Sequence, residues 1–439
     1  MKAKLNLITE KAKRDKRLKF TSLIHHINED NLVKSYYELK KEKASGIDGV
    51  TVEEYGRDLE WNIYHLVERL KTKSYRPQPV RRVYIPKAGK KDEKRGLGIP
   101  TVEDKLVQQM LKKLLEAIFE TDFVEFSHGF RPKRSCVTAI DQLDKEVMTK
   151  RINFIVEVDI RKFFDTVSHH WLLRCLEERV SDRNLLWLVR QFLKAGVMEN
   201  GNYHASDLGT PQGGVVSPLF ANIYLHYVLD IWFERVIKQD SRGHMQMVRY
   251  CDDFVVCCES ERDAKEFLVK LEERFAKFGL SVSPEKTKIV KFGKSAWQRS
   301  KKGEEKAETF NFLGFTHYCG KSRRGFFIMG HKTAKENLNR KCKGVSEWIK
   351  VACRSQPLEA WWPVLNAKLK GHYNYFGISG NMRCIQQFYW QVVNTVFKRI
   401  NRRSQRRSMT WESFRKYLEW YPLAAPRICH SLYTLSPLK

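Results

Sequence analysis

The chain alternates between helix-like and strand-like patterns of apolar residues. Apolar residues that recur every three or four positions predict amphipathic helices, and short β-branched runs predict strands. Strands are predicted at 76–87, 153–159 and 310–317, a hairpin at 245–259, and an exposed polar loop at 294–308. Helices are predicted at 59–70, 101–118, 169–180, 182–194, 219–237, 264–278 and 383–400. This order predicts a small antiparallel sheet backed by helices, then a mainly helical region.

The hairpin predicted at 245–259 has two adjacent acids at its tip, Asp252 and Asp253. Adjacent carboxylates repel each other, and burial adds a desolvation cost that a bound cation would offset. A solvated acidic turn is the ordinary alternative. Because the flanking runs are apolar on both faces, we favour a hairpin within a core sheet, with a divalent cation at its tip.

A third carboxylate, Asp159, ends the strand predicted at 153–159, and an aromatic pair, Phe163 and Phe164, follows it. Two Mg²⁺ ions need several oxygen ligands between them. We therefore expect Asp159 to lie near the hairpin tip. The predicted metal site therefore contains Asp159, Asp252 and Asp253.

A strand-ending Asp, an aromatic pair and a separate Tyr-x-Asp-Asp hairpin together resemble the reverse transcriptases. More narrowly, the chain resembles the reverse transcriptase/maturases encoded by bacterial group II introns. Further motifs of that family follow in the same order at 46–49, 85–87, 96–101, 128–132, 209–214 and 312–315. The sequence ends at Lys439 without the Cys-pair and His pattern of an HNH endonuclease, so we expect no such domain.

The resemblance implies a right-hand polymerase of the α/β (α+β) class. It places an N-terminal extension and the start of the fingers at 1–75, and fingers and palm at 76–318. A helical thumb or maturase domain is expected at 319–400, and a short basic nucleic-acid-binding segment at 401–439. The implied activity is RNA-directed DNA synthesis with two Mg²⁺ ions, for which Mn²⁺ can substitute. The implied catalytic residues are Asp159, Asp252 and Asp253, and the implied metal ligands are these three residues and Ile160.

The resemblance also implies contacts with the incoming nucleotide. Phe164 occupies the place of the aromatic ring that excludes a 2′-hydroxyl, although one of Phe163 and Phe164 is a core residue. The basic residues have an ordinary alternative as solvated surface charges. Arg95 is followed by Gly96 where the family usually has proline, which puts the stiffness of that loop in question. The predicted nucleotide-binding residues are Lys87, Arg95, Arg131, Phe164, Gln212 and Lys286.

The charge balance points to nucleic acid as the partner. There are 80 Lys and Arg residues against 51 Asp and Glu, a formal net charge of +29, which a polyanion would neutralise. No acid interrupts the cationic run from Lys398 to Ser408, which favours phosphate contact over a solvated face. The predicted nucleic-acid-binding residues are Lys398, Arg399, Arg402, Arg403, Arg406 and Arg407.

Partners and compartment follow from the same observations. We expect RNA template, intron RNA, a DNA primer or target and deoxynucleoside triphosphates, but no membrane, because no apolar run approaches the ~20 residues that span a bilayer. An apolar signal core is missing and the ten cysteines lack metal-ligand spacing, which favours a cytoplasmic protein with reduced thiols. Two alternatives stay open: a free-standing reverse transcriptase in phage defence or DNA repair, and an RNA-binding splicing factor with a secondary polymerase site. The sequence leaves the oligomeric state unknown.

Overall fold

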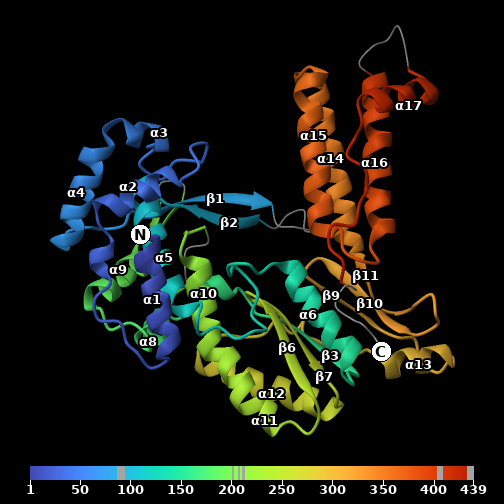
Figure 1. Cartoon of the computed structure of the whole chain (residues 1–439), viewed down its shortest axis with the longest axis horizontal. Coiled ribbons are helices and arrows are strands. Elements are labelled where there is room, and N and C mark those ends of the chain that lie inside the picture. The colour runs from blue at the N-terminus through green and yellow to red at the C-terminus, as the bar shows by residue number, and fades with distance from the viewer. Residues whose placement is uncertain (87–93, 200–201, 206–207, 210–212, 403–408, 433–439) are drawn as a thin grey trace. The chain divides into compact units, whose positions relative to one another are not determined.

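The computed structural model describes residues 1–86, 94–199, 202–205, 208–209, 213–402 and 409–432 (Figure 1). The chain divides into two compact units whose segments interleave along the sequence. Unit 1 comprises Met1–Ser135, Val158–Phe254 and Arg262–Lys288. Unit 2 comprises Cys136–Glu157, Val255–Glu261 and Ile289–Lys439.

The N-terminal helices of unit 1 pack around the long helix α5 (Val102–Phe119). Its N-cap Thr101 accepts a hydrogen bond from the backbone N–H of Asp104, and Glu103 and Asp104 suit the positive end of the helix dipole. A buried stripe that includes Leu106, Leu111 and Ile118 faces the core. The helices that precede it are α1 (Lys2–Arg14), α2 (Glu29–Tyr37), α3 (Val52–Tyr55) and α4 (Leu59–Lys71).

A four-stranded sheet follows these helices, in the order β2-β1-β4-β5. β1 and β2 form an antiparallel hairpin in which Arg81 pairs with Ile99 and Pro86 with Lys94. β1 also pairs in parallel with β4, so a strand from after residue 195 extends the hairpin. The strands are β1 (Val80–Pro86), β2 (Lys94–Ile99), β4 (Val197–Glu199) and β5 (Asn202–His204).

The second four-stranded sheet has the order β6-β7-β3-β8. The hairpin of β6 (Met245–Tyr250) and β7 (Asp253–Cys258) lies within the predicted range 245–259 and ends one residue earlier. The other strands are β3 (Phe154–Asp159) and β8 (Lys288–Lys291). The helices in these segments are α6 (Cys136–Thr149), α7 (Phe163–Thr166), α8 (His169–Glu177), α9 (Arg183–Lys194), α10 (Ser217–Leu225), α11 (Lys238–Asp240) and α12 (Glu261–Lys277). Between α10 and α11, residues 226–230 and 233–237 form π-helical turns.

The C-terminal part of unit 2 combines a three-stranded antiparallel sheet with a helical bundle. The sheet contains β9 (Thr309–Phe312), β10 (Phe315–Lys321) and β11 (Phe327–Thr333). Helices α14 (Lys335–Ser355), α15 (Leu358–Phe376) and α16 (Met382–Asn401) lie side by side (Figure 1), with α17 (Trp411–Trp420) after them. Their shared core includes Ile349, Trp361 and Val392, all fully buried.

The predicted mixture of helices, antiparallel strands and a helical C-terminal region is confirmed, but two local predictions are wrong. Residues 310–317 are not one strand, because Leu313 and Gly314 have φ of +49° and +81° and form a turn between β9 and β10. The predicted loop at 294–308 contains helix α13 (Lys294–Lys301), whose Ala296 is buried and whose Trp297 ring lies 6.0 Å from that of Phe327. Among the described residues, no helix is long and apolar enough to cross a membrane.

Candidate active site

The strand pairing brings the predicted carboxylates to one edge of the β6-β7-β3-β8 sheet. The backbone N–H of Asn153, just before β3, donates to the carbonyl of Cys258 at the end of β7, with N and O 3.0 Å apart. The start of β3 therefore lies beside the end of β7, and the two neighbouring strands are antiparallel. It follows that Asp159, which ends β3, lies beside Asp252 and Asp253 at the start of β7.

The turn itself has an unusual backbone conformation. Cys251 is buried and has φ of +59°, a left-handed conformation that a residue with a side chain seldom adopts. Burial raises the pKa of its thiol, so Cys251 is a neutral packing residue at neutral pH. Asp252 is half-buried and Asp253 is exposed. The corner therefore turns its acids away from the core while its cysteine anchors it.

A buried arginine holds this corner in place. The guanidinium of Arg249 is fully buried, and its Nη1 donates to the carbonyl of Cys251 at 2.9 Å. Its Nε and Nη2 donate to the two carboxylate oxygens of Asp230 at 2.7 and 2.5 Å. Burial raises the pKa of Asp230, and the guanidinium opposes that shift. Two further acceptors complete the arrangement, Oδ1 of Asn222 and Oγ of Ser127.

The loop before α6 packs directly against the same corner. The backbone of Arg249 exchanges hydrogen bonds with residues 126 and 128, at 2.9 and 2.8 Å. Asn222 Nδ2 donates to the carbonyl of Gly129 at 2.6 Å. A Cβ on Gly129 would clash with the main-chain nitrogen of Cys251, so this position requires glycine. Arg249 and Asp230 are not among the residues predicted from the sequence, although each is a charged residue inside an apolar run.

Lys286 contacts the strand-ending acid. Its Nζ lies 2.9 Å from Oδ2 of Asp159, and the two side chains are 60% and 43% exposed. The backbone N–H of Ser283 donates to the Asp159 carbonyl at 2.8 Å, which fixes the segment that carries Lys286. Ile160, buried next to Asp159, pairs with Val282 in an antiparallel bridge. Lys286 thus directs a positive charge at the predicted metal site.

The donor set fits Mg²⁺ chemistry, but it does not form a complete cage. Among the described residues, no group of three His, Cys, Asp or Glu side chains is placed to hold a metal ion. Mg²⁺ commonly takes only one or two protein carboxylates, together with water and substrate phosphates. Carboxylate oxygens are its preferred protein ligands, and the ammonium of Lys286 already lies against one of them. Asp159, Asp252 and Asp253 could therefore hold Mg²⁺ when a nucleotide supplies the remaining oxygens.

The aromatic pair divides into a core ring and a half-exposed one. Phe163 is 2% exposed, and its ring lies 6.4 Å from that of Tyr224. Phe164 is half-buried. Gly209, with φ of +84°, approaches so closely that an added Cβ would lie 2.7 Å from the Phe164 carbonyl oxygen. Of the two rings, Phe164 is therefore the one available to a ligand.

Arg131 is held by the protein itself. Its guanidinium forms an ion pair with Glu120 at 2.9 Å and donates to the carbonyls of Val124 and Ser127 at 2.6 Å. The side chain is 4% exposed and lies over the ring of Phe123. Because these acceptors occupy its donors, the geometry favours a structural role in the 124–131 loop over the predicted nucleotide contact.

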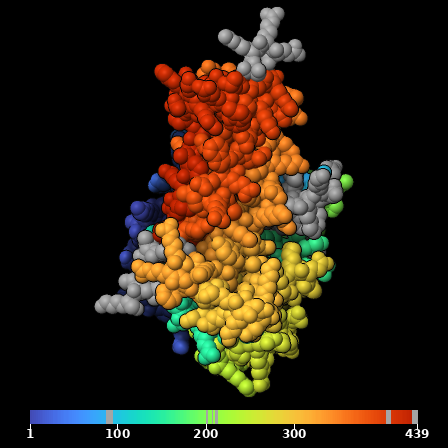
Figure 2. All heavy atoms as spheres, turned by 90° about the vertical axis from the view of Figure 1, so that its right-hand side faces the viewer, coloured from blue at the N-terminus to red at the C-terminus, as the bar shows by residue number. Residues whose placement is uncertain are grey.

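The other predicted residues are described only in part. Lys87, Gln212, Arg403, Arg406 and Arg407 lie outside the described residues. Arg95 lies on β2, where its backbone pairs with Ile85. Lys398 and Arg399 form the last turn of α16, and Arg402 caps that helix and is exposed. Figure 2 shows the surface of this C-terminal region in orange to red.

Comparison with known proteins gives consistent matches. Residues 85–317 match the family described as "Reverse transcriptase (RNA-dependent DNA polymerase)". "Group II intron-encoded protein LtrA" of Lactococcus lactis subsp. cremoris is 29% identical over 87% of this chain and 74% of that protein. "Protein YkfC" of Escherichia coli K12 is 36% identical over 45% of this chain and 52% of that protein. "Putative COX1/OXI3 intron 2 protein" of Saccharomyces cerevisiae is 37% identical over 49% of this chain and 25% of that protein. The resemblance that the motifs predict is confirmed.

Proposed function

Because the chain belongs to the reverse transcriptase (RNA-dependent DNA polymerase) family, we propose that its polymerase site is formed by Asp159, Asp252 and Asp253. The observation that carries this proposal is the antiparallel pairing of β3 and β7, which sets the end of one strand beside the tip of the hairpin. Two Mg²⁺ ions bound there would activate the primer 3′-hydroxyl and neutralise the leaving pyrophosphate.

The residues of the chain contribute position and charge. The three carboxylates would hold the metal ions, with the backbone of Ile160 beside them. Lys286, now paired with Asp159, would turn its ammonium to the phosphates when a nucleotide arrives. Phe164 would lie under the sugar and exclude a 2′-hydroxyl. The fingers hairpin would contact the nucleotide through Lys87 and Arg95, and the 209–214 segment through Gln212. Catalysis of this kind rests on positioning and electrostatics, without a covalent intermediate.

Metal dependence tests this assignment. Purified protein should extend a DNA primer on an RNA template with Mg²⁺ or Mn²⁺ and fail without either. The Asp159→Asn variant should extend the primer more slowly and require a higher Mg²⁺ concentration. Its affinity for the annealed template and primer should stay near that of the wild type. Equal rates and equal metal requirements for Asp159→Asn and the wild type would remove Asp159 from the site.

We also propose the finer architecture that the family implies. The 76–318 region would supply fingers and palm, and the bundle of α14, α15 and α16 the thumb or maturase domain. Residues 1–75 and 401–439 would add RNA-binding surface at the two ends. The net charge of +29 and the exposed cations Lys398 and Arg402 support this role.

The splicing role rests on the similarity to intron-encoded proteins. A basic surface that binds folded intron RNA better than unfolded RNA would stabilise the fold and lower the Mg²⁺ that splicing needs. The test is splicing of an intron that flanks the gene, at low Mg²⁺, with wild-type protein and with Asp252→Asn. Both should help equally, because binding and polymerisation use different residues. Help from neither would favour a free-standing reverse transcriptase.

A further inference from the structure

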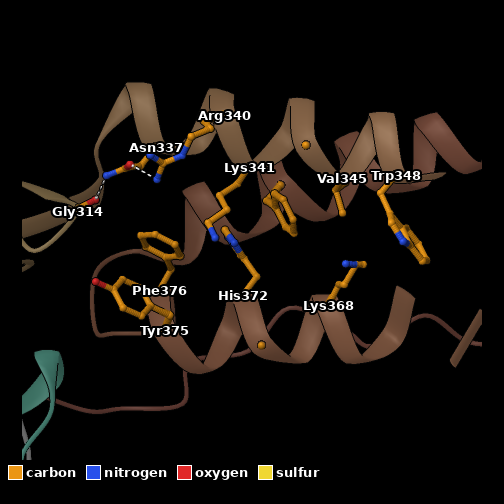
Figure 3. Close-up of a pocket in the computed structure, with 13 residues that line it drawn as sticks. Gly314, Asn337, Arg340, Lys341, Val345, Trp348, Lys368, His372, Tyr375 and Phe376 are labelled. Carbon is orange, nitrogen blue, oxygen red and sulfur yellow. Dashed lines mark hydrogen bonds between the residues drawn. The ribbon is translucent and has the colours of Figure 1, made fainter. Parts of the chain in front are cut away.

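The helices α14, α15 and α16 of unit 2 line a cavity of about 750 Å³ (Figure 3). Its volume falls within the ~300–1,000 Å³ typical of small-molecule sites and far exceeds the ~30 Å³ share of one water. Gly344 of α14 and Gly371 of α15 line it, and a Cβ added at either glycine would meet no atom within 4 Å. The polymerase site described above uses none of the residues that line this cavity.

A buried histidine whose ring nitrogens have no hydrogen-bond partner among the described residues points into the cavity (Figure 3). His372 of α15 is 7% exposed, and within the described structure neither of its ring nitrogens has a hydrogen-bond partner. Its ring stacks on Phe388 of α16, with centroids 3.7 Å apart and planes 15° apart. Figure 3 shows the imidazole directed between α14 and α15. A buried polar group left unsatisfied costs about 1–3 kcal/mol, so a ligand that hydrogen-bonds to this ring would recover a comparable free energy.

The protonation state of His372 defines what it can bind. Burial and the nearby ammonium of Lys341 lower the pKa of His372 to about 4. The imidazole is therefore neutral at pH 7 and offers one hydrogen-bond donor and one acceptor. This pattern matches the edge of a heterocyclic base, which presents donors and acceptors side by side in one plane.

The rest of the lining is cationic and aromatic. Arg340 and Lys341 of α14 and Lys368 of α15 line the cavity, and none of the described residues around it is acidic. Lys368 Nζ lies 4.8 Å from the ring centroid of Trp348, so an aromatic face and a positive charge adjoin each other. The cationic side chains can form charge-assisted hydrogen bonds to a phosphate, and a planar ring can stack on the indole of Trp348.

We propose that this cavity binds a single nucleotide, with its base between Trp348 and His372 beside Lys368, hydrogen-bonded to His372, and its phosphate on Arg340 and Lys341. The nucleotide is either a free mononucleotide or one unpaired nucleotide of a bound RNA. The two sources share the same chemistry, and two probes separate them.

The first probe is mononucleotide, AMP or UMP, titrated into the full-length protein by calorimetry. The second is an RNA stem with one unpaired nucleotide, compared with a fully paired stem of equal length. Gly371→Leu fills the cavity without removing a charge, and Gly371→Ala is its matched control, because both replace a helical glycine. His372→Phe removes the two ring nitrogens and keeps the ring. Lys341→Gln removes one cation from the cavity. Its control is Lys350→Gln, which removes a charge from an exposed position of α14 outside the cavity.

We expect wild-type protein to bind a mononucleotide at one site, or to bind the stem with the unpaired nucleotide with about 10-fold higher affinity than the fully paired stem. Gly371→Leu, His372→Phe and Lys341→Gln should lose that binding or preference, while Gly371→Ala and Lys350→Gln keep it. Unfolding midpoints confirm that each variant is folded. The proposal is overturned if wild type shows neither response, or if the folded Gly371→Leu and His372→Phe variants respond as wild type does. Primer extension is measured in parallel, so a failure here is distinguishable from a failure of the polymerase assignment.

Discussion

The ammonium nitrogen of Lys286 lies 2.9 Å from the carboxylate oxygen Oδ2 of Asp159, at the end of strand β3. Both side chains are substantially exposed, and exposed ion pairs contribute only about 0–1 kcal/mol to stability. Folding therefore gains little from this contact. A lysine beside the proposed metal-binding carboxylates fits the proposed role in chemistry, in which its charge would move to the phosphates of the substrate.

Replacing Lys286 with Gln should slow primer extension by about 10²-fold, because the charge that we propose stabilises the leaving pyrophosphate is removed. Single-turnover rates at saturating nucleotide measure this loss. Lys288→Gln, two residues further along, is the control and should retain the wild-type rate. A folded Lys286→Gln variant with an unchanged rate would show that the contact with Asp159 is incidental.

Replacing Asp230 with Ala should destabilise the protein by about 3–5 kcal/mol, because the fully buried guanidinium of Arg249 then loses its counter-charge. Urea unfolding measures the change. The double variant Asp230→Ala with Arg249→Met should lose less than the sum of the losses of Asp230→Ala and Arg249→Met alone, since no buried charge is left alone. Additive losses would mean that the two residues act independently.

Phe164→Ala should admit ribonucleotides, because it removes the half-exposed ring that a 2′-hydroxyl would strike. The measurement is the ratio of ribonucleotide to deoxynucleotide incorporation on one template. Phe163→Leu serves as the control: that ring is in the core, so stability should fall while sugar selection stays. If Phe163→Leu changes selection and Phe164→Ala does not, the two roles are reversed.

The protein should lose stability between pH 7 and pH 5, in part through His372. Its pKa is about 4 in the folded chain and about 6.5 when unfolded, so the unfolded state binds the proton first as pH falls. The contribution is complete above about pH 6.5 and smaller by about 2 kcal/mol at pH 5. His372→Phe should show a shallower decline in urea midpoint over this range. Identical declines in both proteins would contradict the assigned pKa.

The sequence predicts those parts of the fold that depend on local pattern. The helices predicted at 101–118 and 169–180 form, and Thr101 and Ser168 cap them, because a hydroxyl before an apolar stripe favours an N-cap. The β6–β7 hairpin is predicted with its tip, since apolar runs and a polar corner are adjacent in the sequence. The position of Asp159 beside that tip was expected because Mg²⁺ needs a further carboxylate, and the pairing of β3 with β7 accounts for it physically.

The rest depends on contacts between distant segments. Nothing near Arg249 in the sequence indicates that its partners are Asp230, Asn222 and Ser127, because π-helical turns and a parallel bridge bring them together. The environment of Arg131 was missed for the same reason, since Glu120 pairs with it across a turn. No sequence pattern predicts the cavity beside His372, because helices α14, α15 and α16 form it only when they pack together.

The most direct test of the polymerase site is RNA-templated extension of a DNA primer by Asp252→Asn in Mg²⁺, with Asp240→Asn as control. Asp240 is an exposed acid that pairs with Lys270 on the surface. We expect the Asp252 variant to lose at least about 10²-fold in rate with little change in affinity for template and primer, and the Asp240 variant to match wild type. An Asp252→Asn protein that polymerises at the wild-type rate would contradict the carboxylate site.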